Sequence, residues 1–301
     1  MRKKSEVEVE IVGGLGNQLF GYAAGLFLSQ KTMSSLKLNL SMIGVGGTDH
    51  GKSILGFSIP SNLFIERSSV VNTRRFINRV NNKFARHFKS YRKKKNAFLG
   101  EYVATELGFE EEFWQLNKAR KLKGYFQSYT YTDCVRDILI KELVIPNPTS
   151  WYLAQLDIIK EQDPIAIHVR RGDFLNLLDD FGVLDISYFE SVIQKHVHNS
   201  ENRKIWIFTD SPEIVAQEIQ GTALQESIIV KPAPDSNVNE EMLLMSNFRT
   251  LVISNSTFSW WSAYLSNKET DIHAPSKWFK ARRDPERLLP PEWNLHESIW
   301  R

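Results

Sequence analysis

After about residue 150, short apolar runs alternate with segments of helix length. The runs are IAIHV (165–169), KIWIFTD (204–210), SIIV (227–230), TLVIS (250–254) and TDIHA (270–274). Apolar strands that alternate with helices are typical of a parallel sheet covered on both faces. Ligands of such sheets bind at the carboxyl ends of the strands. We therefore expect the functional side chains of this region directly after the apolar runs.

The N-terminal residues predict a further α/β unit. A strand-like alternation, a glycine turn, an apolar helix and a second strand follow one another in VEVEIV (7–12), GGLGNQ (13–18), LFGYAAGLFLSQ (19–30) and LKLNL (36–40). At 301 residues the chain is long enough for two domains. The two prolines of VIPNPTSW mark a linker, so we expect the domains to be 1–148 and 149–301.

Polar side chains crowd the end of the run IAIHV, where His168, Arg170, Arg171 and Asp173 follow one another closely. A guanidinium group stays charged and matches two phosphate oxygens at once. The arginines therefore predict a diphosphate site. The alternative is a solvated strand end that carries an Arg–Asp ion pair.

The stretch SNSTFSWW (254–261) follows another apolar strand and opens a helix. Ser256 and Thr257 can cap this helix, and its free N–H groups together with the two hydroxyls would form an anion site. Capping alone is the simpler interpretation. Asp210 ends a third strand, where it either faces the same ligand or caps the helix before Pro212.

The glycine turn GGLGNQ contains Gly14 and Gly16 but lacks the third glycine of a dinucleotide-binding loop. It indicates either a tight turn or a backbone that comes close to a ligand, with Asn17 placed to donate a hydrogen bond.

Five stretches together resemble the α-1,2-fucosyltransferases of glycosyltransferase family 11. They are GGLGNQLFGYA, GYFQSYTYT, HVRRGDF, EEMLLMSN and SNSTFSWWSAYL, in that order, and APSKWF and PPEWN resemble the C-terminal end of the family. The resemblance covers most of the chain, although residues 41–98 match poorly. It implies an α/β fold of GT-B type, with two Rossmann-like domains that face a central cleft.

The same resemblance implies the reaction. L-Fucose would pass from GDP-β-L-fucose, with inversion, to the 2-hydroxyl of an acceptor galactose, without a metal or other cofactor. Residues 1–148 would form the acceptor-side domain, and 149–301 the GDP-fucose-binding domain. A fucosyltransferase of another linkage and a non-catalytic nucleotide-sugar-binding or membrane-adaptor protein are the alternatives.

The resemblance also implies roles for individual residues. Arg170 would contact the donor diphosphate, and Glu241, where the family usually has Asp just before the last strand, would read the guanine edge. The expected donor site comprises Gly14, Gly16, Asn17, His168, Arg170, Arg171, Asp210, Glu241, Ser256, Thr257 and Phe258.

Inversion requires that the attacking hydroxyl lose its proton, usually to a carboxylate within about 3 Å. The candidates are Asp173, Asp179 and Asp180, and we expect Arg170, Asp173 and Asp179 to be catalytic. Asp173 can instead orient Arg170 or Arg171. In a loose, oxocarbenium-like transition state, the arginines would contribute most of the rate by stabilising the departing GDP.

Residues 67–100 contain 11 Lys or Arg and no acidic residue. They explain much of the charge asymmetry, because residues 1–150 carry 23 Lys and Arg against 13 Asp and Glu, a net charge of +10. Segment 74–95 predicts an amphipathic basic helix with apolar residues four apart, at Phe76, Val80, Phe84 and Phe88. It either packs on the core or attaches to an anionic membrane surface that carries lipid-linked acceptors. Nucleic-acid binding is not expected, because no such module is recognisable.

The location follows from what the sequence lacks. Glu6, Glu8 and Glu10 interrupt any signal-peptide core, and no run reaches the ~18 apolar residues of a membrane span. The single cysteine, Cys134, is typical of a reducing compartment. We expect a bacterial cytoplasmic enzyme of surface-polysaccharide or O-antigen synthesis, peripheral on the inner membrane face.

Overall fold

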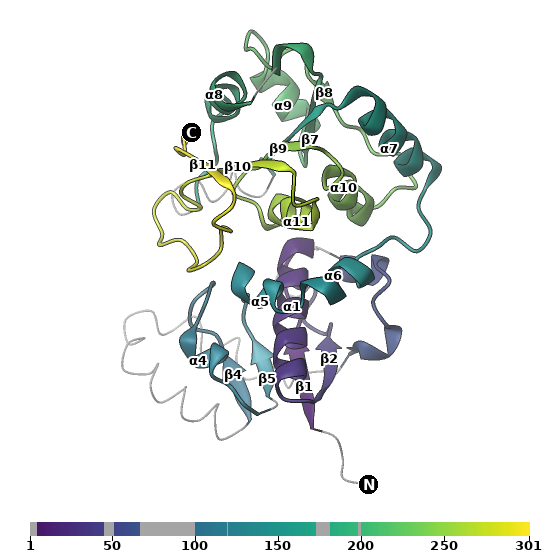
Figure 1. Ribbon diagram of the computed structural model, residues 1–301, viewed down its shortest axis with the longest axis vertical. Coiled ribbons are helices and arrows are strands. Elements are labelled where there is room, and N and C mark those ends of the chain that lie inside the picture. The colour runs from purple at the N-terminus through teal and green to yellow at the C-terminus, as the bar shows by residue number, and fades with distance from the viewer. Residues whose placement is uncertain (1–4, 45–50, 67–99, 119, 173–180, 198–199) are drawn as a thin grey trace. The chain divides into compact units, whose positions relative to one another are not determined.

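The computed structural model describes residues 5–44, 51–66, 100–118, 120–172, 181–197 and 200–301. The chain forms two compact units (Figure 1). The first unit comprises Met1–Leu55, Ile59–Leu143 and Pro285–Leu288, and the second comprises Gly56–Ser58, Val144–Asp284 and Leu289–Arg301. A division of the sequence at one point does not describe this arrangement, because Pro285–Leu288 returns to the first unit.

The first unit contains a parallel sheet in the order β3-β2-β1-β5-β4. Its strands are β1 (Glu6–Glu10), β2 (Ser35–Asn39), β3 (Phe64–Ile65), β4 (Glu101–Val103) and β5 (Lys121–Lys123). Its helices are α1 (Leu15–Lys31), α4 (Glu111–Trp114), α5 (Tyr129–Asp133) and α6 (Arg136–Glu142), with short 3-10 turns at Ser53–Gly56 and Ser61–Leu63. The predicted strand, turn, helix and strand at the N-terminus are confirmed.

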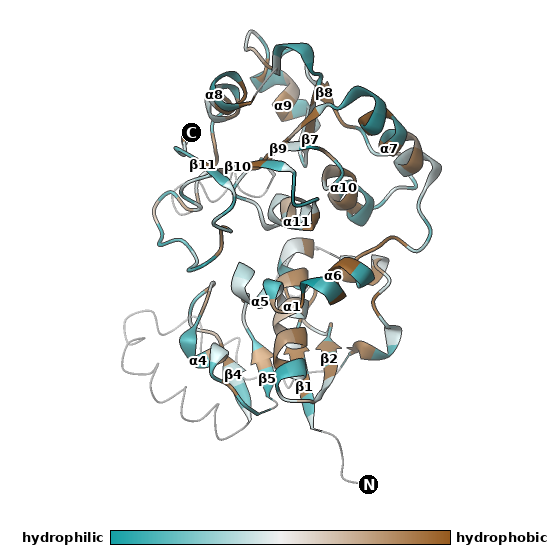
Figure 2. Ribbon diagram, in the orientation of Figure 1, coloured by the Kyte–Doolittle hydropathy of each residue, from teal (hydrophilic) through white to brown (hydrophobic). Residues whose placement is uncertain are grey.

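Helix α1 packs on β1 and β2, and hydrophobic residues lie on both α1 and β2 (Figure 2). Gly25 permits the close approach, because a Cβ atom there would lie 2.5 Å from a methyl group of Val9. Every residue of α1 from Leu15 to Ser29 except Asn17 is buried. The helix is therefore a central element, and its N-terminus is fixed at the carboxyl edge of the sheet.

The second unit contains a parallel sheet in the order β11-β10-β9-β6-β7-β8. Its strands are β6 (Ile165–Val169), β7 (Ile205–Thr209), β8 (Ile228–Ile229), β9 (Thr250–Val252), β10 (Asp271–Pro275) and β11 (Asn294–His296). Its helices are α7 (Ser150–Gln162), α8 (Ile186–His196), α9 (Pro212–Glu218), α10 (Val238–Met245) and α11 (Thr257–Leu265), with a 3-10 turn at Ser200–Asn202. The predicted parallel α/β sheet is confirmed.

The two faces of β6 have different neighbours. Ile165, Ile167 and Val169 pack in one hydrophobic cluster with residues of α8 and α9. Because side chains alternate along a strand, His168 lies on the opposite face. There its ring lies 5.5 Å from the ring of Phe258 in α11, measured between centroids.

In the part of the chain that the structure describes, no helix has the length and apolar character needed to cross a membrane. The basic segment 74–95 lies outside the described residues.

Candidate functional site

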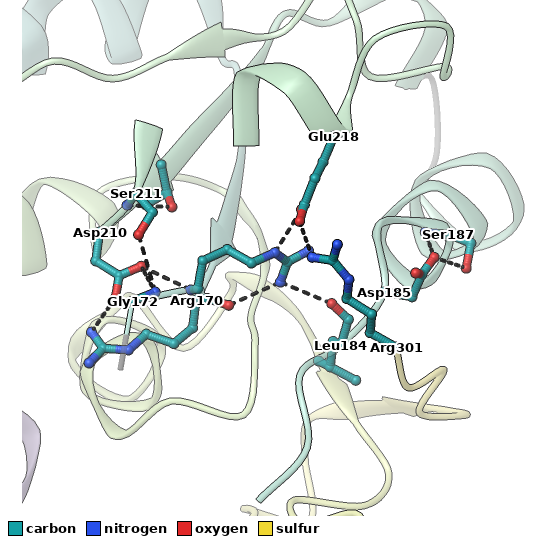
Figure 3. A network of polar contacts seen from close by, with 11 residues as sticks. Arg170, Gly172, Leu184, Asp185, Ser187, Asp210, Ser211, Glu218 and Arg301 are labelled. Atoms are coloured by element: carbon teal, nitrogen blue, oxygen red, sulfur yellow. Dashed lines mark hydrogen bonds and ion pairs between the residues drawn. The ribbon is translucent and has the colours of Figure 1, made fainter. Parts of the chain in front are cut away.

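Arg170 and Asp210 meet at the carboxyl edge of the second sheet (Figure 3). The last residues of β6 and β7, Val169 and Thr209, are partners in the parallel register. The residues that follow them are therefore neighbours, and Nη1 of Arg170 lies 3.1 Å from Oδ2 of Asp210. Both side chains remain about a quarter exposed. This ion pair presents a guanidinium group at the edge where parallel sheets bind ligands.

Asp210 also accepts hydrogen bonds from the backbone. Its Oδ1 accepts from the N–H groups of Arg171, at 2.9 Å, and Gly172, at 3.2 Å. The absence of a side chain at Gly172 makes this possible, because a Cβ atom there would lie 2.2 Å from Oδ2 of Asp210. Asp210 does not cap α9, whose N-cap residue is Ser211. Its carboxylate instead holds the loop after β6 and orients Arg170.

The side chain of Arg171 is buried in the interior of the unit, in contrast to the partly exposed side chain of Arg170. Its side chain is 1% exposed, and its Nε lies 2.7 Å from Oε2 of Glu218 in α9. Its Nη1 donates to the carbonyl oxygens of Arg170 and Leu184, each at 3.0 Å. Arg171 was expected in the donor site, but its guanidinium group is instead occupied in a buried ion pair that joins α9 to the loop before α8.

His168 is buried and neutral. Its Nδ1 lies 2.7 Å from the hydroxyl of Ser254, which follows β9. Burial, with a smaller contribution from the charge of Arg170, lowers the pKa of His168 to about 3. The imidazole is therefore a hydrogen-bonding group beside Arg170 and a weak proton acceptor.

Ser256 is confirmed as the N-cap of α11, where its Oγ accepts from the N–H of Phe258 at 3.3 Å. Thr257 is the first helical residue, and its side chain, like that of Phe258, is only partly buried. Asn255 fixes the loop by donating to the carbonyl oxygens of Gly182 and Trp278, each at 3.1 Å. Because β9 is the neighbour of β6, the N-terminus of α11 begins one strand away from Arg170.

Glu240 and Glu241 are adjacent in α10 but have opposite environments. Glu240 is fully buried and accepts from the backbone N–H and the hydroxyl of Thr149, at 2.6 and 2.9 Å. Glu241 is partly buried, and desolvation raises its pKa to about 7. The expectation that Glu241 directly precedes the last strand is wrong, because β9, β10 and β11 all follow α10. Of the two carboxyl groups in α10, that of Glu241 is the one that is not fully buried.

Gly14, Gly16 and Asn17 lie at the N-terminus of α1 in the first unit. The N-cap residue of α1 is Gly14, and no side chain caps the helix there. Gly13 has a φ of +73°, which favours glycine, and Nδ2 of Asn17 lies so close that a Cβ atom on Gly13 would be 2.9 Å from it. Oδ1 of Asn17 accepts from Nε2 of Gln127 at 2.9 Å.

The structure therefore brings together His168, Arg170, Asp210 and Ser256, with Thr257 and Phe258, in the second unit. Arg171 is separated from them by its pairing with Glu218, a residue that no motif distinguishes in the sequence. Gln127 was also missed, although it stands in the quoted motif GYFQSYTYT. Asp173, Asp179 and Asp180 lie outside the described residues.

Comparison with known proteins identifies the family. The sequence model of Glycosyl transferase family 11 matches residues 62–297. The chain is similar to an α-1,2-colitosyltransferase of Escherichia coli, with 28% identity over 96% of this chain and 98% of the relative. It is also similar to the O-antigen biosynthesis glycosyltransferase WbnK of Escherichia coli, with 26% identity over 93% and 97% of the two chains.

Among solved structures, the fucosyltransferase NodZ from Bradyrhizobium matches with a TM-score of 0.50 and 16% identity, over 88% of this chain and 93% of that one. At this identity the likeness shows the fold alone. It confirms the α/β fold of GT-B type.

Proposed function

We propose that this chain, which belongs to glycosyl transferase family 11 and is a glycosyltransferase, transfers L-fucose from GDP-β-L-fucose to the 2-hydroxyl of an acceptor galactose. The observation that carries the proposal is the Arg170–Asp210 pair at the carboxyl edge of the second sheet. A fixed guanidinium group beside a helix N-terminus and a neutral imidazole suits a diphosphate. The similar O-antigen glycosyltransferase supports a glycan acceptor of that class.

The residues support an inverting displacement. The acceptor hydroxyl oxygen forms a bond to C1 of the sugar, while the bond between C1 and the diphosphate oxygen breaks. GDP leaves with the bonding electron pair, and the hydroxyl proton passes to a base. Arg170 stabilises the charge that develops on the departing diphosphate, and Asp210 keeps the guanidinium in place before the charge appears.

We propose the rest of the donor site by the same reasoning. Asn17, Gly14 and Gly16 contribute the N-terminus of α1, and Ser256, Thr257 and Phe258 contribute that of α11. His168 donates or accepts a hydrogen bond but is a poor base at a pKa of about 3. Asp173, Asp179 and Asp180 remain the predicted candidates for the base.

Colitose is the second candidate for the transferred sugar, because the chain is similar to an α-1,2-colitosyltransferase. Colitose lacks the 3-hydroxyl of fucose, so the two donors differ by one polar group. A screen of galactosides with radiolabelled GDP-fucose and GDP-colitose tests both proposals, and NMR of the product gives the linkage. Transfer to a hydroxyl other than the 2-hydroxyl would contradict the α-1,2 assignment. If neither GDP-fucose nor GDP-colitose supports transfer, the enzymatic proposal as a whole is contradicted.

Glu241 is proposed to accept hydrogen bonds from the N1–H and the amino group of guanine. Only the ionised carboxylate accepts both, and desolvation holds its pKa at about 7. GDP affinity is therefore expected to rise with pH through about 7 and to level above it, with a slope of about tenfold per pH unit at most for one proton. In Glu241→Gln this component of the pH dependence disappears.

Isothermal titration of GDP from about pH 6 to about pH 8 measures this difference. The terminal phosphate of GDP titrates in the same way with both proteins, so the difference between their profiles isolates Glu241. ADP, whose base lacks these two donors, is the control ligand. Parallel profiles for wild type and variant would show that Glu241 does not contact guanine.

Transfer is expected to continue in excess EDTA. Arg170 provides the positive charge opposite the diphosphate that Mg²⁺ or Mn²⁺ provides in metal-dependent enzymes. In the described part of the chain, no group of three or more His, Cys, Asp or Glu side chains is arranged to hold a metal ion. The check is the initial rate with labelled donor before and after chelation. Loss of activity that Mn²⁺ restores would require a metal in the donor site.

Two expectations about the surroundings of the enzyme stay predictions. The first concerns segment 74–95, which either packs on the core or attaches the protein to an anionic membrane surface that carries lipid-linked acceptors. The second is a cytoplasmic location, peripheral on the inner membrane face.

A further inference from the structure

The first unit contains a buried glutamine with an unused hydrogen-bonding atom. Gln127 follows β5 and is only 6% exposed. Its Nε2 donates to Oδ1 of Asn17 at 2.9 Å. Its Oε1 is buried and has no hydrogen-bond partner among the described residues. An unsatisfied buried carbonyl oxygen is costly, so such groups in native proteins call for a specific explanation.

The backbone fixes where this side chain lies. Gly124 has a φ of +152° and Phe126 a φ of +53°, so the chain turns sharply between β5 and Gln127. The N–H of Gln127 donates to the carbonyl oxygen of Leu107 at 2.6 Å. The turn places the Gln127 amide against Asn17 in the first turn of α1, at the carboxyl edge of the first sheet.

A second buried glutamine, Gln18 in the first turn of α1, has no unused atom. Gln18 donates through Nε2 to the carbonyl oxygens of Gly13 and Gly51, at 2.8 and 3.0 Å. Its Oε1 accepts from the N–H of Ile54 at 3.1 Å. Gln18 therefore holds the glycine loop in place. The side chain of Gln127, in contrast, makes one hydrogen bond among the described residues, to Asn17, and its oxygen has no partner there.

We propose that Gln127 is a specificity residue, which accepts a hydrogen bond from one hydroxyl of a substrate sugar. This inference rests on the proposed function. Asn17 and Gln127 together offer an amide donor and an amide acceptor side by side. A hydroxyl satisfies such a pair because it donates and accepts at once. A phosphate oxygen only accepts, so it cannot satisfy Oε1 of Gln127. The geometry thus assigns this position to a sugar hydroxyl and not to a phosphate.

Gln127 is also a positioning residue for Asn17. By donating to Oδ1 of Asn17, it fixes the orientation of that amide, whose Nδ2 lies over Gly13. Loss of the Gln127 amide would therefore release Asn17 and leave the sugar hydroxyl without its acceptor.

The test compares substrates that lack one hydroxyl each. One arm uses GDP-fucose and its 2-, 3- and 4-deoxy analogues, and the other uses galactosides that lack single hydroxyls other than the one attacked. With the wild-type chain, one analogue is expected to show roughly 10- to 100-fold lower kcat/KM, the usual effect of leaving a buried acceptor unpaired. In Gln127→Met the analogue and the complete substrate should have nearly equal kcat/KM. Gln127→Glu, which keeps an oxygen at this position, should retain the difference between them.

Gln18→Met is the matched control, because it removes the other of these two buried amides but leaves Oε1 of Gln127 in place. It should lower stability and retain the hydroxyl penalty. If the penalty disappears among the GDP-fucose analogues, the hydroxyl belongs to the donor sugar. If it disappears among the galactosides, the hydroxyl belongs to the acceptor. If wild type transfers the sugar but no penalty changes in Gln127→Met, the inference is wrong and a bound water satisfies Oε1. If wild type transfers no sugar, the proposed function fails, and this inference fails with it.

Discussion

Replacement of Arg170 by lysine is expected to lower the rate of transfer several hundred-fold without unfolding the protein. Lysine keeps the positive charge but loses the planar fork that contacts Asp210 and that is proposed to bind two diphosphate oxygens. Loss of one preorganised charged contact at a leaving group costs on the order of 3–4 kcal/mol of transition-state stabilisation. The measurement is the single-turnover rate at saturating donor, with the melting temperature recorded for the same preparation.

Arg203→Lys is the matched control. Arg203 also pairs with a carboxylate, because its Nη2 lies 3.3 Å from Oδ1 of Asp163. Its Nη1 donates to Thr250, the first residue of β9, so it lies at the amino edge of the same sheet. Its replacement should leave the rate near that of wild type. Equal rates for wild type and Arg170→Lys would contradict the diphosphate assignment.

Replacement of Arg171 by methionine is expected to act on stability instead. The side chain is buried, and its removal takes one of two cationic partners from Glu218 and a hydrogen-bond donor from the carbonyl oxygen of Leu184. Breaking a buried ion pair typically costs 3–5 kcal/mol, and the loss here should be about 3 kcal/mol because Arg301 also contacts Glu218. Urea unfolding measures the change in the free energy of unfolding.

Arg170→Met is the comparison for stability. Arg170 is partly exposed, and Asp210 keeps its backbone donors, so this change should cost less than about 1 kcal/mol. Substitutions of the two neighbouring arginines should thus have different effects. Loss of Arg170 should lower activity, and loss of Arg171 should lower stability. If the Arg171→Met protein is stable but no longer binds GDP, the result would show that Arg171 belongs to the donor site as first expected.

The strands show how far local sequence carries a prediction. The apolar run 165–169 is β6 with the same bounds, and the runs for β7, β9 and β10 are each placed to within a few residues. β11 was missed because its residues, Asn294–His296, are largely exposed at the edge of the sheet and form no apolar run. β4 and β5 were missed because each has only three residues, too few to establish an alternation.

The sequence by itself determined the longer strands, the first helix and the chemistry at the ends of these elements. Strand alternation, the glycine loop and the Ser256 cap each depend on residues only a few positions apart, so local order specifies them. The motifs also determined the family. The motifs singled out Arg170, at the end of β6, and Glu241, in α10.

Only the tertiary structure decided which partner each of these side chains has. Arg170 and Arg171 are adjacent, yet one pairs with Asp210 after β7 and the other with Glu218 in α9. Gln127 meets Asn17 across 110 residues of sequence. Such partners depend on which strands become neighbours in the parallel sheets, and long crossover connections set that order. Burial then decides which polar atoms are satisfied and which, like Oε1 of Gln127, remain for a ligand.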